Sequence, residues 1–309
     1  MPEVVRLQPP LAERVAALLD EAETVDGARA LSEHAELALH GAGATPSDGF
    51  VHIGVESPHG VTGQDGAALL AYAQVDMTGD GPISVEGVIH PAHRRGGVGA
   101  AVAVAVLRAA GGRGVLAWAH GDQPGATALA ARLGARRVRE LLQMRRPLPV
   151  ALPEPALPAG LRLRAFRPGQ DDEAWLAVNA RAFAAHAEQG AWTRTDLDAR
   201  MAEPWFDPEG FLLAEDEATG DLLGFHWTKV HPATGAHPQT GEVYVLGVDP
   251  PAQGRKLASA LTLAGLHHLG RRGLSAVLLY VEADNDAALR VYRGMGFEVA
   301  AVDVRYALP

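Results

Sequence analysis

The sequence predicts an α+β fold in which a mixed, mostly antiparallel sheet flanked by helices occurs twice in tandem. The first observation is that strands and helices are expected in the same order in both halves of the chain. The second is that matching residues recur at nearly one offset, since Pro91 and Pro250 lie 159 positions apart and Gly134 and Gly296 lie 162 apart. The third is length, because 309 residues suit two domains of about 150 each.

A proline-rich segment separates the two halves. Residues 147–160 carry five prolines, and proline lacks an amide donor and restricts the residue before it. This composition is typical of an extended linker. We therefore expect a first domain at residues 1–146 and a second at residues 161–309.

Apolar spacing predicts the helices, and β-branched runs bounded by glycine or proline predict the strands. The first half is expected to form strands at 4–7, 51–55, 67–76, 83–90, 114–119 and 137–144, with helices at 11–23, 30–40, 97–110 and 126–133. The second half is expected to form strands at 161–166, 210–215, 222–230, 241–248, 276–281 and 298–308, with helices at 171–184, 195–202, 256–269 and 287–295.

Composition excludes several classes of function. Hydrophobic residues make up 48% and charged residues 21%, which predicts a packed globular core. The net charge of −10 argues against a nucleic-acid or anionic-membrane surface. The sequence has no cysteine, so it has no disulfide, thiolate metal site or cysteine nucleophile. The chain begins without a signal-peptide core, and its longest apolar run, residues 99–107, is about half a membrane span. We expect a cytoplasmic protein, and two fused domains favour a monomer.

Each half contains a turn suited to binding an anion. A strand that ends near proline is followed by a glycine-containing turn at residues 94–99 and again at residues 253–258. Such a turn points unpaired backbone N–H groups and the positive end of a helix at one place, and small residues let a pyrophosphate come close. Either turn alone is equally typical of a glycine-rich loop with basic surface residues.

The residues expected to hold this anion are the strand ends, the turns and the first helical residues. They are Gly87, Val88, Ile89, Arg94, Arg95, Gly96, Gly97, Val98 and Gly99 in the first half, and Leu246, Gly247, Val248, Gln253, Gly254, Arg255, Lys256, Leu257, Ala258 and Ser259 in the second. Lys256 stands where the pattern favours glycine. Our hypothesis is that its backbone is helical, so that the amides still face the anion.

The ordered set of strand, turn, helix, strand, short helix and "RLGA" or "GMGF" resembles the GNAT superfamily of acetyl-CoA-dependent N-acetyltransferases in both halves. A Rossmann fold is a weaker interpretation, because no G-x-G-x-x-G is present. The segments "GFHWTKVHP", "GEVYVLGVDP", "LLYVEADNDAALRVYRGMGF" and "VDVRYAL", together with "TVDGARALSEH", resemble the mycothiol synthase family. That resemblance implies acetyl transfer from acetyl-CoA to the cysteinyl amine of cysteinyl-glucosaminyl-inositol.

Acetyl transfer to an amine needs a proton acceptor for the ammonium and a proton donor for the leaving thiolate. The resemblance implies Glu242 as the base and Tyr292 as the acid. Read alone, Glu242 is more typical of a solvated strand end, and Tyr292 is more typical of a core aromatic at helical spacing. Because cysteine is absent, we expect direct transfer without an acyl-cysteine intermediate.

The short helix after "ADND" is expected to line the CoA arm, and Asn285 or Asp284 to cap it. The residues concerned are Asn285, Asp286, Ala287, Ala288, Leu289 and Arg290. Aligned through Gly134, the first half has Ala130 at the Tyr292 position and Gln123 opposite Asn285. We therefore expect the first half to bind a second acetyl-CoA without catalysing.

The resemblance also implies substrate contacts at Glu33, Glu188, Lys229, Glu242 and Tyr280. Carboxylates suit sugar hydroxyls and an ammonium, although each residue is equally compatible with surface charge or strand packing. The 13 histidines, among them His186, His226, His231, His237, His267 and His268, show no metal-ligand spacing, so we predict packing or surface roles and no metal.

Two other functions remain open. One is a tandem acetyltransferase for a peptide N-terminus or an aminoglycoside. The other is a CoA-binding sensor without turnover, which Lys256 favours because it interrupts the turn of the half that carries Glu242 and Tyr292.

Overall fold

The computed structural model describes residues 3–8, 11–40, 49–57, 68–148, 152–233 and 238–309. The chain forms two compact units, of which unit 1 comprises Met1–Leu142 with Ala301–Pro309 and unit 2 comprises Gln143–Ala300. The predicted α+β class is confirmed in both units. The predicted elements are present, with bounds within three residues of those expected, although residue 67 of one expected strand and His237 lie outside the described residues.

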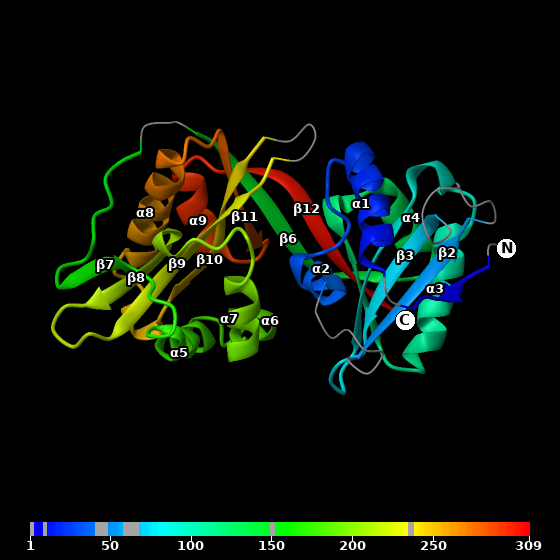
Figure 1. Cartoon of the computed structure of the whole chain (residues 1–309), viewed down its shortest axis with the longest axis horizontal. Coiled ribbons are helices and arrows are strands. Elements are labelled where there is room, and N and C mark those ends of the chain that lie inside the picture. The colour runs from blue at the N-terminus through cyan, green and yellow to red at the C-terminus, as the bar shows by residue number, and fades with distance from the viewer. Residues whose placement is uncertain (1–2, 9–10, 41–48, 58–67, 149–151, 234–237) are drawn as a thin grey trace. The chain divides into compact units, whose positions relative to one another are not determined.

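Unit 1 is a mixed sheet with helices on both faces (Figure 1). Its strands lie in the order β1 (Val5–Arg6), β2 (Phe50–Glu56), β3 (Leu69–Asp76), β4 (Ile83–Ile89), β5 (Val115–Ala119) and the end of β12 (Glu298–Leu308). Among the strand pairs described for unit 1, β4 and β5 pair in parallel and the others pair antiparallel. Its helices are α1 (Ala12–Asp26), α2 (Glu33–His40), α3 (Val98–Ala110) and α4 (Pro124–Arg132). Val15 and Leu18 of α1 pack on one face, and Val102 and Val106 of α3 pack on the other.

Unit 2 repeats this plan. Its strands are, in order, the end of β6 (Arg136–Pro147), β11 (Ala276–Glu282), β10 (Thr240–Val248), β9 (Leu222–His231), β8 (Phe211–Asp216) and β7 (Leu161–Ala165). Its helices are α5 (Asp172–Ala182), α6 (Ala187–Gly190), α7 (Arg194–Met201), α8 (Leu257–Arg271) and α9 (Asp286–Gly294). An aromatic core around Trp175 and Trp227 fills one face, and Leu257 and Leu261 of α8 pack on the other. The sequence did not predict α6, because four residues are too few to show a helical period.

Unit 1 contains the last strand segment of the chain. The end of β12 pairs antiparallel with β5, from Val304 opposite Ala119 to Leu308 opposite Val115. Val304 is fully buried and Tyr306 is 6% exposed. Unit 1 therefore depends on residues that follow the whole of unit 2 in the sequence.

A histidine whose side chain is 13% exposed fastens this strand to the rest of unit 1. His120 Nε2 lies 3.3 Å from Glu86 Oε2, and its Nδ1 lies 3.0 Å from Asp303 Oδ2. The Ser32 hydroxyl donates to Glu86 at 2.7 Å, and the Gly121 amide donates to Asp303 at 2.8 Å. Burial alone would lower the pKa of His120, but hydrogen bonds and charge from both carboxylates raise it to about 9.

We expect unit 1 to lose stability at alkaline pH. The folded state binds the His120 proton more tightly than the unfolded chain, whose histidine pKa is 6.5. This contribution is therefore complete below pH 6.5 and is lost as pH rises through about 9. The expected loss is on the order of 3 kcal/mol. Urea unfolding followed by ¹⁹F NMR of fluorotryptophan at Trp118, the single tryptophan of unit 1, measures it. A pH slope that persists in His120→Gln would assign the effect to other groups.

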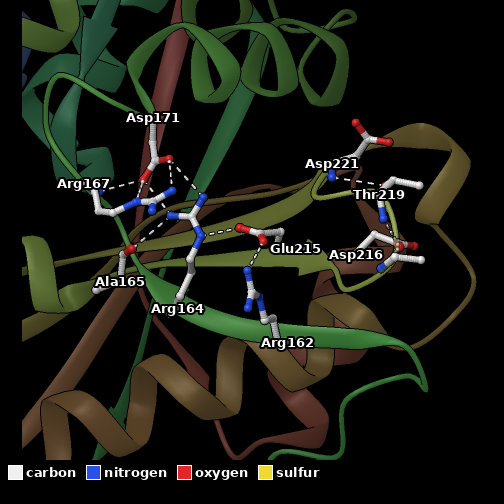
Figure 2. Close-up of polar contacts among 10 residues, drawn as sticks. Arg162, Arg164, Ala165, Arg167, Asp171, Glu215, Asp216, Thr219 and Asp221 are labelled. Carbon is white, nitrogen blue, oxygen red and sulfur yellow. Dashed lines mark hydrogen bonds and ion pairs between the residues drawn. The ribbon is translucent and has the colours of Figure 1, made fainter.

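An arginine–carboxylate network covers the edge strand β7 (Figure 2). Glu215 of β8 accepts hydrogen bonds from Arg162 and Arg164, and Arg164 also donates to Asp171 at 2.6 and 3.0 Å. Burial opposes ionisation of Asp171, but Arg164 and Arg167 outweigh it and lower its pKa to about 2. Charged side chains on an edge strand oppose pairing with another chain. The network therefore joins β7, β8 and the start of α5 and protects the edge of the unit 2 sheet.

Candidate active site

The two turns that are expected to bind an anion follow the same backbone path. In each unit a short 3₁₀ turn, Pro91–His93 or Pro250–Ala252, leads from the strand to the helix. Two positions in each turn are left-handed, with φ of 65° at Arg95 and 86° at Gly97 in unit 1. In unit 2 the equivalent angles are 77° at Gly254 and 64° at Lys256. Each turn therefore has one glycine and one basic residue at these positions, in exchanged order.

Matching side chains also stabilise the turns. Arg94 Nε donates to the Ile89 carbonyl at 3.1 Å, and Gln253 Nε2 donates to the Val248 carbonyl at 3.3 Å. The Arg94 guanidinium makes two further bonds of 2.6 Å to Asp26. These side chains brace the turn, so the groups best placed for an anion are the first backbone amides of α3 and α8, which have no intrahelical acceptor.

The hypothesis that Lys256 adopts a helical backbone is wrong. Lys256 is left-handed at φ 64° and ψ 14°, and it caps the N-terminus of α8 as Gly97 caps α3. The left-handed conformation costs a residue with a Cβ about 1–2 kcal/mol. The turn thus keeps the glycine-like geometry at the expense of local strain.

Replacing Lys256 by glycine should relieve this strain without rebuilding the turn. Glycine also has more freedom in the unfolded chain, which offsets about 0.5–1 kcal/mol of the gain. We expect Lys256→Gly to change the free energy of unfolding by less than about 1 kcal/mol and acetyl-CoA affinity only modestly. Calorimetric titration and urea unfolding check both values. A large gain in affinity would show that the lysine obstructs the site.

Glu242 lies on β10, the strand that enters the turn of unit 2. It is 6% exposed, and His231 Nε2 of β9 donates to its Oε2 at 2.6 Å. A β-bulge between Val243 and Val245 follows it, and bulges commonly redirect side chains beside active sites. Burial alone would raise the pKa of Glu242, but the hydrogen bond and charge of His231 and the charge of Lys229 lower it below its ordinary value. The carboxylate is thus ionised and able to accept a proton.

Tyr292 lies on α9 and is 8% exposed, with its ring against Phe297 at 5.8 Å between centroids. Burial raises the pKa of its phenol to about 12, so the hydroxyl carries its proton at neutral pH. Asn285 caps α9 by accepting from the Ala288 amide at 3.1 Å, which confirms one of the two expected caps. The phenol has the protonation state that a general acid requires.

Unit 1 lacks both groups at the equivalent positions. Ala130 occupies the place of Tyr292 in α4. The sheet register places Ser84 at the Glu242 position, because Ser84 pairs with Leu116 as Glu242 pairs with Leu278. The β3–β4 ladder also pairs without the bulge of β10. Unit 1 therefore has the turn but not the proton acceptor and donor.

Three of the expected substrate contacts share one face of the unit 2 sheet. Lys229 pairs with Glu242 across β9 and β10, and Tyr280 lies two residues from Leu278, the β11 partner of Glu242. The Lys229 ammonium lies 4.5 Å from the Trp205 ring centroid, and Tyr280 is 43% exposed. Glu33 belongs to unit 1, at the start of α2, and the side chain of Glu188 lies outside the described part of α6.

His231 is the residue that the sequence analysis missed. The sequence predicts a surface or packing role for it, yet it bonds directly to Glu242. The eleven residues between His231 and Glu242 match no sequence motif. The β9–β10 register brings the two side chains together. By contrast, His226 is fully buried against the Leu261 carbonyl, as a packing role predicts. The described residues contain no group of three or more side chains placed to hold a metal.

A bulged strand leading into a helix start with free backbone amides, followed by a helix that carries a buried tyrosine, is the arrangement expected of a GNAT-type acetyltransferase. The profile of the acetyltransferase (GNAT) family matches residues 177–297, within unit 2. Mycothiol acetyltransferases of Thermobispora bispora and Streptomyces avermitilis are 50% and 51% identical to this chain. These matches cover 98% and 97% of the chain, and 97% and 92% of the relatives. The chain belongs to the mycothiol acetyltransferase family, and it is an N-acetyltransferase that uses acetyl-CoA.

Solved structures agree with the fold of both halves. A tandem GNAT protein from the clavulanic acid biosynthesis pathway has a TM-score of 0.74 at 21% identity, with coverage of 99% of this chain and 98% of that one. A GCN5-related N-acetyltransferase from Sphaerobacter thermophilus has a TM-score of 0.72 at 24% identity, with coverage of 99% and 96%. In the parts of the chain that the structure describes, no helix is long and apolar enough to span a bilayer.

Proposed function

We propose that the protein transfers the acetyl group of acetyl-CoA to the cysteinyl amine of cysteinyl-glucosaminyl-inositol, and that unit 2 carries the reaction. The observation that carries the proposal is Glu242, a buried carboxylate held ionised at the start of the strand that enters the anion-binding turn. The names of the relatives supply the substrate class. The proposal also includes the expected oligomeric state, a monomer, and the expected compartment, the cytoplasm.

The proposed chemistry is direct transfer. Glu242 accepts a proton from the substrate ammonium, and the free amine attacks the thioester carbonyl. The carbon–sulfur bond then breaks, and the CoA thiolate takes the Tyr292 proton, which solvent replaces. One proton leaves to solvent per turnover, because the ammonium loses two and the thiol keeps one. The sequence offers no cysteine for an acyl intermediate.

Unit 1 is proposed to bind a second acetyl-CoA without turnover. Its turn has the same left-handed positions as that of unit 2, which supports binding. Ala130 and Ser84 at the positions of the acid and base support the absence of catalysis. The cosubstrate residues proposed for both units are those expected from the sequence, and Glu33, Glu188, Lys229 and Tyr280 remain proposed substrate contacts.

Release of CoA thiol with competing amines tests the proposed substrate. We expect purified protein to acetylate cysteinyl-glucosaminyl-inositol with a kcat/KM at least about tenfold above that for a peptide N-terminus or an aminoglycoside, since a site built for substrate hydroxyls discriminates strongly against analogues that lack them. Preference for either rival would replace the substrate. Acetyl-CoA binding without thiol release from any amine would favour the sensor.

A further inference from the structure

One polar contact on the active face of unit 2 has so far entered only through its effect on the pKa of Glu242. The Glu242 side chain is 8% exposed and that of His231 is 38% exposed, and Nε2 and Oε2 are 2.6 Å apart. Among the described residues, His231 is the one hydrogen-bond partner that the Glu242 carboxylate has. The bond therefore fixes one carboxylate oxygen and leaves Oε1 for a substrate proton.

The strand register places His231 and Lys229 beside the Glu242 carboxylate. His231 pairs with Thr240 and Lys229 pairs with Glu242, so both basic side chains lie on the same face as the carboxylate. On the other flank the register partner of Glu242 is Leu278, which has no charge. The charges that act on Glu242 are thus those of His231 and Lys229 on β9.

Lys229 cannot provide the same orientation. Its ammonium lies 4.5 Å from the Trp205 ring centroid and 5.2 Å from that of Tyr244. The ammonium therefore contacts the faces of these aromatic rings. It acts on Glu242 through charge, whereas His231 acts through a directed hydrogen bond as well. A directed bond to a general base restricts which oxygen, and which direction, faces the reacting amine.

We propose that His231 is a positioning residue of the acetyl transfer, which pins Oε2 of Glu242 and presents Oε1 to the substrate ammonium. The inference rests on the proposed role of Glu242 as base and not on the identity of the amine. The proposal gives His231 a role in acetyl transfer. It also distinguishes the effect of the His231 charge on Glu242 from the effect of its hydrogen bond.

Two substitutions separate these contributions. His231→Gln keeps a neutral N–H donor within reach of Oε2, and His231→Leu removes donor and charge. His267→Gln is the matched control, because this α8 histidine of the same unit contacts the Pro153 carbonyl instead. The spectroscopic readout is the ¹³C NMR titration of the Glu242 carboxyl carbon, assigned by its loss in Glu242→Gln. It requires no turnover.

We expect the Glu242 titration to move to higher pH in His231→Leu, to move less in His231→Gln, and to stay unchanged in His267→Gln. Turnover at saturating substrates should fall most in His231→Leu and recover in large part in His231→Gln, with acetyl-CoA affinity and thermal unfolding unchanged. An unmoved carboxyl titration in His231→Leu would overturn the inference. If the wild type rejects cysteinyl-glucosaminyl-inositol, the proposed substrate fails, and the carboxyl titration still decides the role of His231.

Discussion

Tyr292→Phe is expected to lower kcat at least about 100-fold, the contribution typical of a positioned general acid. Phenylalanine keeps the ring that packs against Phe297 and removes only the hydroxyl, so the free energy of unfolding should change little. Because burial raises the pKa of Tyr292 to about 12, the wild-type enzyme should show no basic limb from this residue below pH 10. Steady-state CoA release across pH 6–10 measures kcat and its pH dependence.

The loss in Tyr292→Phe has to be separated from a loss of binding. Acetyl-CoA titration should give the same affinity for unit 2 in the variant as in the wild type, since the hydroxyl acts on the leaving thiolate. An equal fall in affinity and in kcat would make Tyr292 a binding residue, and the general acid would have to be sought elsewhere.

Deletion of residues 301–309 is expected to unfold unit 1 and leave unit 2 folded. The deletion removes the strand that pairs with β5, and with it the buried Val304 and Tyr306. Each large apolar side chain removed costs about 2–5 kcal/mol, and the Asp303 partner of His120 is lost as well. Together these losses approach the ~5–15 kcal/mol that holds a typical domain.

Fluorotryptophan labelling reports the two units separately. Trp118 lies in unit 1, whereas the other four of the five tryptophans lie in unit 2. The Trp118 ¹⁹F signal should move to its unfolded position in the deletion variant while the other four stay dispersed. Deletion of Pro309 alone, which is exposed, is the control. A native Trp118 signal in the longer deletion would contradict the dependence of unit 1 on the chain end.

The repeated order of elements was predictable because each strand and helix has its own local period. The equivalence of the two turns was predictable because proline and glycine mark them at one offset. The left-handed backbone of Lys256 was not, since a lysine normally signals a right-handed or extended residue. Pairing between β5 and the end of β12 depends on residues about 190 positions apart, and no local pattern specifies it.

The candidate site also has a part that sequence predicts and a part that only the fold defines. Glu242 and Tyr292 were named through a family resemblance, while their ionisation states follow from burial and neighbours that only the fold defines. His231 was overlooked because a histidine eleven residues before a glutamate has no chemical meaning until a hairpin brings them together. The side-chain partners of a base are therefore the part of a site that sequence patterns predict least.

Comparison of kcat for Tyr292→Phe and Gly97→Glu in one assay tests the central claim, that unit 2 catalyses and unit 1 does not. Gly97→Glu places a carboxylate and a strained left-handed residue in the unit 1 turn, where φ is 86°. We expect native mass spectrometry to count one acetyl-CoA fewer per chain in Gly97→Glu, with kcat close to wild type. Tyr292→Phe should keep the cosubstrate and lose turnover. Equal loss of kcat in the two variants would contradict this division of labour.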